Sequence, residues 1–522
     1  MIDVARRCVV QQRVPRYVAL SYVWGQDAGS SLFASTQTVQ QLAHAGSLSA
    51  DRLPATIQDA LVVCEQLGEP FLWIDRLCIL QDDLTDKQHQ IGAMDRIFSA
   101  AEYVIIALHG TGVNYGLPGV GHARQAWQLQ VALPGGTGTI VARDKSPDET
   151  ETWPTRGWTY QEGVLARRRL YFTNTRVFFE CEQAISHEDM YNSKFNLEIE
   201  NSTKLILPTD NSAFSAYTRH ARNYASLQLR YRSDAYSAFA GISNALFGPN
   251  STHFGLPLSY FDWALHWQND LDATAPLEAE EQCVRFPTWT WMSRVTSPCA
   301  IEYARSELID DDYCGALLAW YRFDETSIDD LRALNDHSVC TLTRNWRFYM
   351  SIAHAAGCTS QYLQTSHIHW PDYETYYQHL AASKPHVSPA TRHALRSTPG
   401  AIIGCTQVSS FPVMTRGHTS YILDAQGHII GEITDTSAQD HSARRHEFIA
   451  LGLIVKPPGY KVSRGDSGTE RNVSWTEAKG VPVVTVMQVR WEGAVAYREG
   501  VGHVYLRDWV EAGREWRDVI LA

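Results

Sequence analysis

Short apolar runs alternate with amphipathic stretches over the first 110 residues. The runs at 17–25, 71–74 and 103–108 are bulky and uncharged, which predicts strands buried on both faces of a sheet. Between them, apolar side chains recur every three or four residues at 57–67 and 91–101, which predicts two helices. Strands and helices that alternate in this way predict an α/β domain with a parallel, doubly wound sheet.

The boundaries of the two helices also have sequence signals. Thr56 and Asp59 have the spacing of a capping box, and Gly68 follows the last apolar position, so we expect the first helix between them. The second helix is predicted as one continuous segment after Asp86, because its apolar stripe runs unbroken to Ala101.

Polar side chains follow the first two predicted strands. The first strand ends at Trp24 and Gly25, and the second is followed by Asp75, Cys78 and Gln81. The carboxyl ends of parallel strands are where open α/β sheets bind ligands. The alternative is that Asp75 caps the following turn and Cys78 fills the core, since buried cysteine is common. Both interpretations stay open at this stage.

A third group of polar residues lies at 156–162, Arg-Gly-Trp-Thr-Tyr-Gln-Glu. In a helix that starts near Trp158, Glu162 lies one turn further along the same face. An aromatic ring beside a carboxylate suits a flat, polar, partly cationic ligand. The alternative is an exposed helix in which Glu162 pairs with a nearby arginine.

The remainder of the chain divides into a helical and a β-rich part. We predict three regions: an α/β domain over 1–190, a helical region over 191–283 and a β-rich region over 284–522. Within the last region, the runs at 420–423 and 428–431 flank Ala-Gln-Gly, which predicts a hairpin.

Composition narrows the classes of protein that the chain can represent. The net charge of −12 over 522 residues argues against nucleic-acid binding and against attraction to anionic lipid. No apolar run is long enough to span a bilayer, and residues 1–16 lack the core of a signal peptide. The ten cysteines form no Cys-x-x-Cys pair, so neither a metal site nor a disulfide framework is predicted. We therefore expect a soluble, cytoplasmic protein.

Several ordered blocks resemble the fungal heterokaryon incompatibility (HET) domain family. The family pattern Tyr-x-Ala-Leu-Ser-Tyr-x-Trp-Gly is followed by Leu-Pro-x-Thr-Ile-x-Asp-Ala, Leu-Trp-Ile-Asp-x-x-Cys-Ile-x-Gln and Arg-x-Trp-x-x-Gln-Glu. The corresponding stretches of this chain are 17–25, 53–60, 72–81 and 156–162. Lys87 and Phe98 stand where the family usually has Trp and Tyr.

The resemblance implies a function and a site. HET domains are associated with programmed cell death after fusion of incompatible fungal cells, and their fold is remotely similar to TIR domains, with a flavodoxin-like sheet. Some TIR domains hydrolyse NAD with a glutamate that follows a tryptophan at the spacing of Trp158 and Glu162. The resemblance therefore implies NAD as a substrate rather than a bound cofactor. It implies Glu162 and Asp75 as catalytic residues, and as ligand-binding residues Tyr22, Trp24, Gly25, Cys78, Gln81, Arg156, Trp158 and Gln161.

In this hypothesis Glu162 stabilises positive charge on the ribose while Trp24 or Trp158 stacks on a ring. Asp75 and Gln81 hydrogen-bond hydroxyl or amide groups, and the Arg156 guanidinium meets the diphosphate.

Two further hypotheses stay open beside NAD hydrolysis. One is a non-enzymatic signalling module that acts through a protein partner or self-association, in which the polar residues only fix the fold. The other is a HET-like fold recruited as an enzyme of a fungal metabolic pathway.

Overall fold

The computed structural model describes the chain in two compact units. The described residues are 1–11, 16–25, 32–124, 128–132, 139–143, 152–188, 213–269, 286–294, 301–303, 313–324, 326, 331–334, 384–416, 419–434, 444–456 and 481–522. The first unit comprises Met1–Leu207 and Leu227–Leu246, and the second comprises Pro208–Ser226 and Phe247–Ala522. The helices of the predicted region 191–283 are thus divided between the two units.

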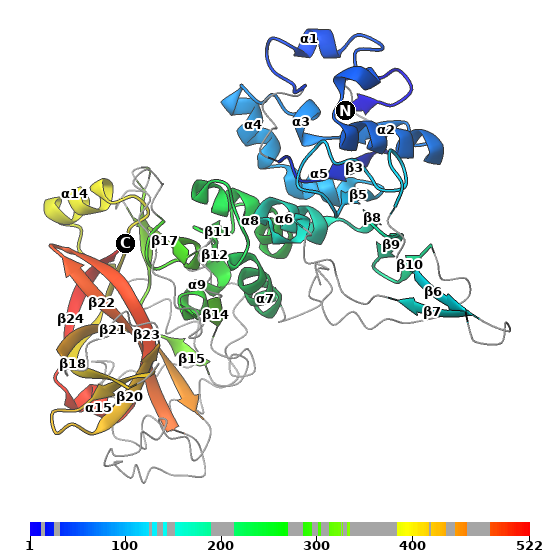
Figure 1. Cartoon of the computed structure of the whole chain (residues 1–522). Helices are drawn as coiled ribbons and strands as arrows, with labels where there is room; N and C mark the ends of the chain where they lie inside the picture. Colours follow the sequence, from blue (N-terminus) through cyan, green and yellow to red (C-terminus); the bar gives the residue numbers. More distant parts are fainter. Residues whose placement is uncertain are drawn as a thin grey trace. The chain divides into compact units, whose positions relative to one another are not determined.

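The first unit is built on an eight-stranded sheet (Figure 1). Its order is β10-β9-β8-β5-β3-β4-β1-β2. The four central strands are β4 (Phe71–Trp73), β3 (Val18–Ser21), β5 (Val104–Ala107) and β8 (Arg168–Phe172), and neighbouring strands among them are parallel. The outer strands are β1 (Ile2–Asp3), β2 (Cys8–Val9), β9 (Val177–Cys181) and β10 (Ile185–His187).

The sheet is mixed, so the expectation of a parallel sheet holds only for its centre. β1 pairs antiparallel with β4 and β2, and β8, β9 and β10 follow one another antiparallel. Short connections cause this difference, because Thr173–Arg176 and Glu182–Ala184 are too short for a crossover helix and allow only hairpins. The mixed α/β class is confirmed.

Helices cover both faces of this sheet. α2 (Ala55–Leu67) packs on one face, where its Ile57, Ala60 and Leu61 meet the apolar side chains of β3 and β4. On the other face lie α5 (Met94–Ala100) and α6 (Gly157–Leu165), whose buried side chains join a second core cluster. The remaining helices of this unit are α1 (Val39–Leu42), α3 (Asp75–Cys78), α4 (Leu84–Ile91) and most of α8 (Ala235–Phe247).

The predicted bounds of α2 are confirmed, with Gly68 as its C-cap, but two other details of the helix prediction are wrong. The chain breaks at Gly92 and Ala93, so the single helix expected after Asp86 is two helices, α4 and α5. The capping box at α2 does not form, because the Thr56 hydroxyl and the Asp59 carboxylate accept the backbone N–H groups of Gly116 and Leu117 instead. These two side chains hold a loop in place, which a local capping pattern cannot reveal.

The second unit has a ten-stranded sheet in which six strands close on themselves. Because β18 pairs with β21 as well as with β19, the order β18-β21-β22-β23-β20-β19 forms a closed ring. These strands are β18 (Ile402–Arg416), β19 (Thr419–Leu423), β20 (Ile429–Thr434), β21 (Arg444–Lys456), β22 (Val481–Glu492) and β23 (Val495–Tyr505). The predicted hairpin is confirmed as β19 and β20.

Short elements complete the second unit. Its helices are α7 (Ala213–Ala225), α9 (Phe261–Ala264), α14 (Pro389–Ser397) and α15 (Leu506–Glu511). Its outer strands are β13 (Trp267–Asn269), β14 (Ile301–Tyr303), β15 (Tyr313–Ala316), β16 (Tyr321–Phe323), β17 (Leu331–Ala333) and β24 (Glu515–Leu521).

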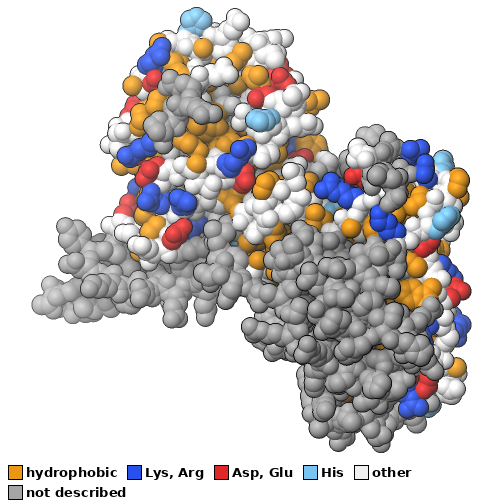
Figure 2. All heavy atoms as spheres, turned by 180° about the vertical axis from the view of Figure 1, so that it is seen from behind, with side chains coloured by type: hydrophobic (Ala, Val, Ile, Leu, Met, Phe, Trp, Pro, Cys, Tyr) orange, Lys and Arg blue, Asp and Glu red, His pale blue; other side chains and the backbone are white. Residues whose placement is uncertain are grey.

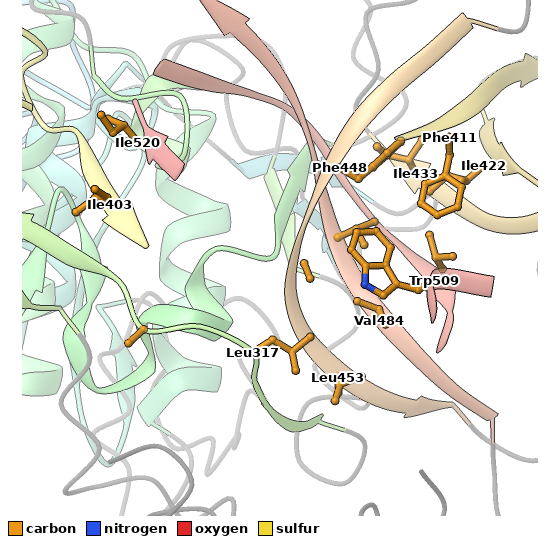
Figure 3. Packing of buried hydrophobic residues seen from close by; sticks show 14 of the residues in the cluster. Leu317, Ile403, Phe411, Ile422, Ile433, Phe448, Leu453, Val484, Trp509 and Ile520 are labelled. Atoms are coloured by element: carbon orange, nitrogen blue, oxygen red, sulfur yellow. The ribbon is translucent and has the colours of Figure 1, made fainter. Parts of the chain in front are cut away.

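An apolar core fills this ring. Trp509 of α15 is fully buried, its ring lies 5.7 Å from Phe411, and Phe411 lies 5.9 Å from Phe448 (Figure 3). The Trp509 indole donates to the buried amide oxygen of Gln407 at 2.9 Å. The buried indole N–H of Trp509 therefore has its partner inside the core.

The described surface carries mixed charge. Figure 2 shows Lys and Arg side chains interspersed with Asp and Glu side chains over one face. Over the described part of the chain, no helix combines the length and the apolar character that crossing a membrane requires.

Candidate functional site

The first part of the site is a chain of hydrogen bonds across the end of β3. Ser21, the last residue of β3, donates its hydroxyl proton to Oε2 of Glu162 on α6. The Ser21 oxygen accepts the indole N–H of Trp153 at 2.8 Å. All three side chains are buried, with Glu162 only 7% exposed. A carboxyl group is thus held inside the domain at the carboxyl end of a central strand.

The second part forms around Asp75, the first residue of α3. Its Oδ2 accepts the indole N–H of Trp24 at 2.8 Å, and its Oδ1 accepts the backbone N–H of Arg76 at 2.6 Å. The fully buried Arg76 guanidinium lies over the Trp24 ring, 5.1 Å from its centroid, and donates to the carbonyl of Leu32. Asp75 therefore lies beside one indole donor and one cation.

The two carboxyl groups influence each other. Burial raises the pKa of Glu162 well above its ordinary value, the charge of Asp75 raises it further, and the Ser21 hydrogen bond opposes both. Burial raises the pKa of Asp75 to about 6, against the lowering effect of the Trp24 hydrogen bond and the Arg76 charge. The pair therefore holds a proton more tightly than an ordinary carboxyl group in water does.

Tyr22 belongs to the same group. It is 5% exposed, and burial followed by the charge of Asp75 raises the pKa of its phenol well above the ordinary value. Its hydroxyl makes no well-aligned hydrogen bond within the described residues. A buried phenol beside a carboxylate can donate a proton to a ligand or to Asp75.

Local packing explains the position of α6. A Cβ atom on Gly163 would lie 2.7 Å from the Trp153 ring, so only glycine allows the helix to approach this indole. The buried guanidinium of Arg169 on β8 donates to the Gly163 carbonyl at 2.6 Å. Gly157, at the start of the helix, donates its N–H to Gln228 at 2.9 Å. These contacts fix the helix turn that carries Glu162.

Gly25 allows two loops to meet at the ends of β3 and β5. It has a φ of +80°, and a Cβ atom there would lie 2.8 Å from the Cα of Gly112. Trp24 accepts the N–H of Val113 across the same contact at 3.2 Å. The observed contact gives Gly25 a backbone role in positioning Trp24, and its implied role in ligand binding stays a prediction.

Gln81 and Cys78 contact the backbone of their own segment. The Gln81 amide donates to the carbonyls of Asp75 and Ile79 at 3.0 and 3.1 Å. The Cys78 sulfur accepts the N–H of Ile74 at 3.5 Å and packs against the apolar core. These contacts hold α3, and with it Asp75, in place.

Gln161 and Trp158 join α6 to the segment that contains α8 (Figure 1). The Gln161 oxygen accepts the N–H of Gly241 at 3.1 Å, and the side chain is fully buried. The Trp158 indole donates to Asp234 at 3.3 Å. Arg156 is the N-cap residue of α6, and its carbonyl accepts the Thr159 hydroxyl. The predicted ligand-binding roles of these three residues stay predictions.

Of the ten predicted site residues, the structure gathers Glu162, Asp75, Trp24 and Tyr22 most closely. Sequence reasoning missed Ser21, Trp153 and Arg76. Ser21 had a usable signal, because a hydroxyl inside a strand buried on both faces needs a hydrogen-bond partner. Trp153 and Arg76 had none, since both depend on contacts between distant segments. No group of three or more potential metal-binding side chains occurs among the described residues.

The fold and the site together define an α/β domain that holds two coupled carboxyl groups near the ends of its central strands. Residues 17–162 match the family model described as heterokaryon incompatibility protein (HET), so this segment is a HET domain. The chain is also similar to heterokaryon incompatibility protein 6, OR allele, of Neurospora crassa, with 34% identity over 106 residues. That match covers 18% of this chain and 14% of the relative. No solved structure matches the chain significantly.

Proposed function

We propose that the chain acts in heterokaryon incompatibility, and that its HET domain does so by hydrolysing NAD at the nicotinamide–ribose bond. The first part is supported by the HET family match and by the printed name of the Neurospora crassa relative. The second part is supported by one observation above the others, the buried pair of Glu162 and Asp75 at the ends of the parallel strands.

The order of the parallel strands also supports the proposal. β4-β3-β5-β8 is, in chain order, 2-1-3-4, the order in which flavodoxin-like sheets begin. In such sheets ligands bind where the order reverses, here beside β3 and its neighbours. Ser21 ends β3, and Asp75 follows β4. We therefore assign the sheet of this unit to the flavodoxin-like class, to which TIR domains are similar.

The reaction needs no external acid or metal. The bond between ribose C1′ and nicotinamide N1 breaks, and its electron pair leaves with the nitrogen, so the cationic ring becomes neutral nicotinamide. A water oxygen bonds C1′ and releases one proton, which gives ADP-ribose. Positive charge develops on the ribose in between, and a nearby carboxylate stabilises it.

The raised pKa of Glu162 suits a cationic substrate. In the ligand-free domain, burial and the charge of Asp75 both make the ionised carboxyl group costly. A nicotinamide ribosyl cation supplies the opposite charge and lowers the pKa of Glu162, so substrate binding replaces the proton. Binding is therefore expected to release a proton and to strengthen as the pH rises through the Glu162 pKa.

Nicotinamide release from NAD tests this function directly. The wild-type protein is compared with Glu162→Gln and Asp75→Asn, which keep the side-chain volume, at low and at high protein concentration. Each variant is expected to lose about 100-fold or more in turnover, a typical effect of removing a group that stabilises the transition state. Glu65→Gln, on an exposed face of α2, is the matched control and should keep full activity.

Two results would contradict the enzymatic proposal. One is wild-type protein that consumes no NAD at any concentration, and the other is turnover that survives in Glu162→Gln.

The structure also favours a second candidate, a non-enzymatic signalling module. Gln81, Cys78 and Gln161 all bind backbone groups, which suits a polar network that only fixes the fold. Growth arrest on expression in fungal cells separates the candidates. Arrest that persists in Glu162→Gln, with unchanged NAD levels, supports the module, whereas arrest lost together with NAD consumption supports the enzyme.

A further inference from the structure

Two hydrogen bonds meet at the Ser21 oxygen. An indole N–H can only donate, so the bond between Trp153 and Ser21 uses the serine oxygen as acceptor. The single hydroxyl proton of Ser21 is then left for its other neighbour, Oε2 of Glu162. The Trp153 bond cannot reverse, whereas a protonated Glu162 can donate to the second lone pair of the Ser21 oxygen. In either direction of that second bond, Oε2 is the Glu162 oxygen that Ser21 holds.

The consequence concerns the second oxygen of the carboxyl group. Ser21 engages Oε2, so Oε1 is the Glu162 oxygen that this hydrogen bond leaves open. The hydrogen bond to Ser21 restrains the carboxyl end of the Glu162 side chain. The adjoining backbone is restrained by Gly163, which packs on the Trp153 ring. Oε1 is thus the oxygen that can meet a ligand.

We propose that Ser21 and Trp153 are positioning residues for Glu162, which hold Oε2 and present Oε1 as the oxygen that meets the substrate. This inference deepens the proposed function and rests on it for the identity of the substrate. Its geometric content can be tested without any turnover. Neither residue touches the substrate in this scheme; both act through Glu162.

The first test follows the titration of the Glu162 carboxyl carbon by ¹³C NMR, with Glu162→Gln used to assign the signal. Ser21→Ala removes the donor that favours the ionised carboxyl, so the titration midpoint is expected to rise. Trp153→Phe keeps a ring against Gly163 but removes the N–H, which frees Ser21 to turn away, so a smaller rise is expected. Ser21→Thr keeps the hydroxyl and should restore the wild-type midpoint.

Ser47→Ala is the matched control. Ser47 is a buried serine of the same unit, and its hydroxyl donates to the Leu42 carbonyl at 2.8 Å. Its removal should leave the Glu162 titration unchanged. Should Ser21→Thr fail to fold by circular dichroism, the comparison of Trp153→Phe with Ser47→Ala carries the test, since both leave Ser21 in place. An unchanged midpoint in both Ser21→Ala and Trp153→Phe overturns the proposal.

The second test separates this inference from the proposed function. At neutral pH, NAD turnover by Ser21→Ala is expected to fall by about tenfold or more, the usual weight of a hydrogen bond to a charged group. The pH profile should move to higher pH together with the NMR midpoint. Wild-type protein without turnover would remove the function but leave the NMR result to decide the positioning role. Turnover with an unmoved profile in Ser21→Ala would remove the positioning role alone.

Discussion

Two buried glutamates of the first unit lie in opposite electrostatic settings. Glu180 on β9 faces Arg169 on β8, with 3.1 Å between the Arg169 Nε and the Glu180 carboxylate, and it also accepts the Tyr171 hydroxyl at 3.0 Å. Glu162 is buried to a similar degree, but the charge that acts on it comes from Asp75 and has the same sign. The charge of Glu180 is compensated by Arg169, whereas burial and the like charge of Asp75 both favour the protonated form of Glu162.

The difference indicates which region serves the fold and which can serve chemistry. A compensated pair satisfies the charges that folding buries. Two like charges in one place destabilise the folded state unless one is protonated, and such pairs are typical of functional sites. The two regions are linked, because Arg169 also donates to the carbonyl of Gly163, the residue after Glu162. Arg169, which compensates Glu180, thus also supports α6, the helix that carries Glu162.

The largest expected effect comes from breaking the compensated pair. Arg169→Met leaves the Glu180 charge buried without its cation, and we expect a loss of about 3–5 kcal/mol in the free energy of unfolding. Urea unfolding followed by tryptophan fluorescence measures it. Arg168→Met is the control, because Arg168 is half exposed and pairs with Glu102 at the surface, where loss of a pair costs about 1 kcal/mol or less.

A double variant sharpens this prediction. Arg169→Met combined with Glu180→Met replaces both charges by apolar side chains and should recover much of the lost stability. Equal losses in the single and the double variant would show that packing, rather than charge compensation, determines the stability of this region.

The second prediction concerns Glu162, where removing the ionisable group is expected to raise the stability at high pH rather than lower it. The pKa of Glu162 is higher in the folded than in the unfolded protein, so its contribution to stability is fully present below the unfolded value and is lost as the pH rises toward the folded one. The amide of Glu162→Gln does not ionise, so the variant does not lose this stability as the pH rises. The variant should therefore equal the wild type in stability near pH 4 and exceed it at pH 8 by about 1 kcal/mol or more, since one pKa unit corresponds to about 1.4 kcal/mol.

Unfolding curves across this pH range, compared between the two proteins, measure the effect. Glu65→Gln on the exposed face of α2 should follow the wild-type curve at every pH. A Glu162→Gln protein that is less stable than wild type at pH 8 would contradict the like-charge description of the site.

Sequence patterns predicted the centre of the sheet and pointed to Asp75 and Glu162 separately, and they missed what depends on contacts between distant segments. The apolar runs at 71–74 and 103–108 are buried strands, and the polar residues after them lie at strand ends, because period and burial are local properties. The antiparallel edges could not be inferred, since a short apolar run looks the same in both strand directions. Thr56 illustrates a different error: its spacing from Asp59 indicated a helix cap, but its hydroxyl binds the backbone of a loop.

The site shows the same division. Asp75 is a candidate from the sequence because it directly follows a buried strand, and Glu162 because it lies one helical turn from Trp158. Their coupling is not visible, because it results from burial and from the approach of α6 to β3. Gly163 explains that approach, and its requirement appears only once the Trp153 ring is seen against it.

The smallest expected effect concerns the hydrogen bonds to the aspartates. Trp24 donates to Asp75 and lowers its pKa, so Trp24→Phe should raise the Asp75 pKa above about 6. The stability lost at neutral pH should be about 1 kcal/mol, the usual net value of one hydrogen bond. Trp158→Phe is the matched control, because its indole donates to Asp234. The ¹³C titration of Asp75 distinguishes them: a rise in both variants, or in neither, would mean that Trp24 does not tune this carboxylate.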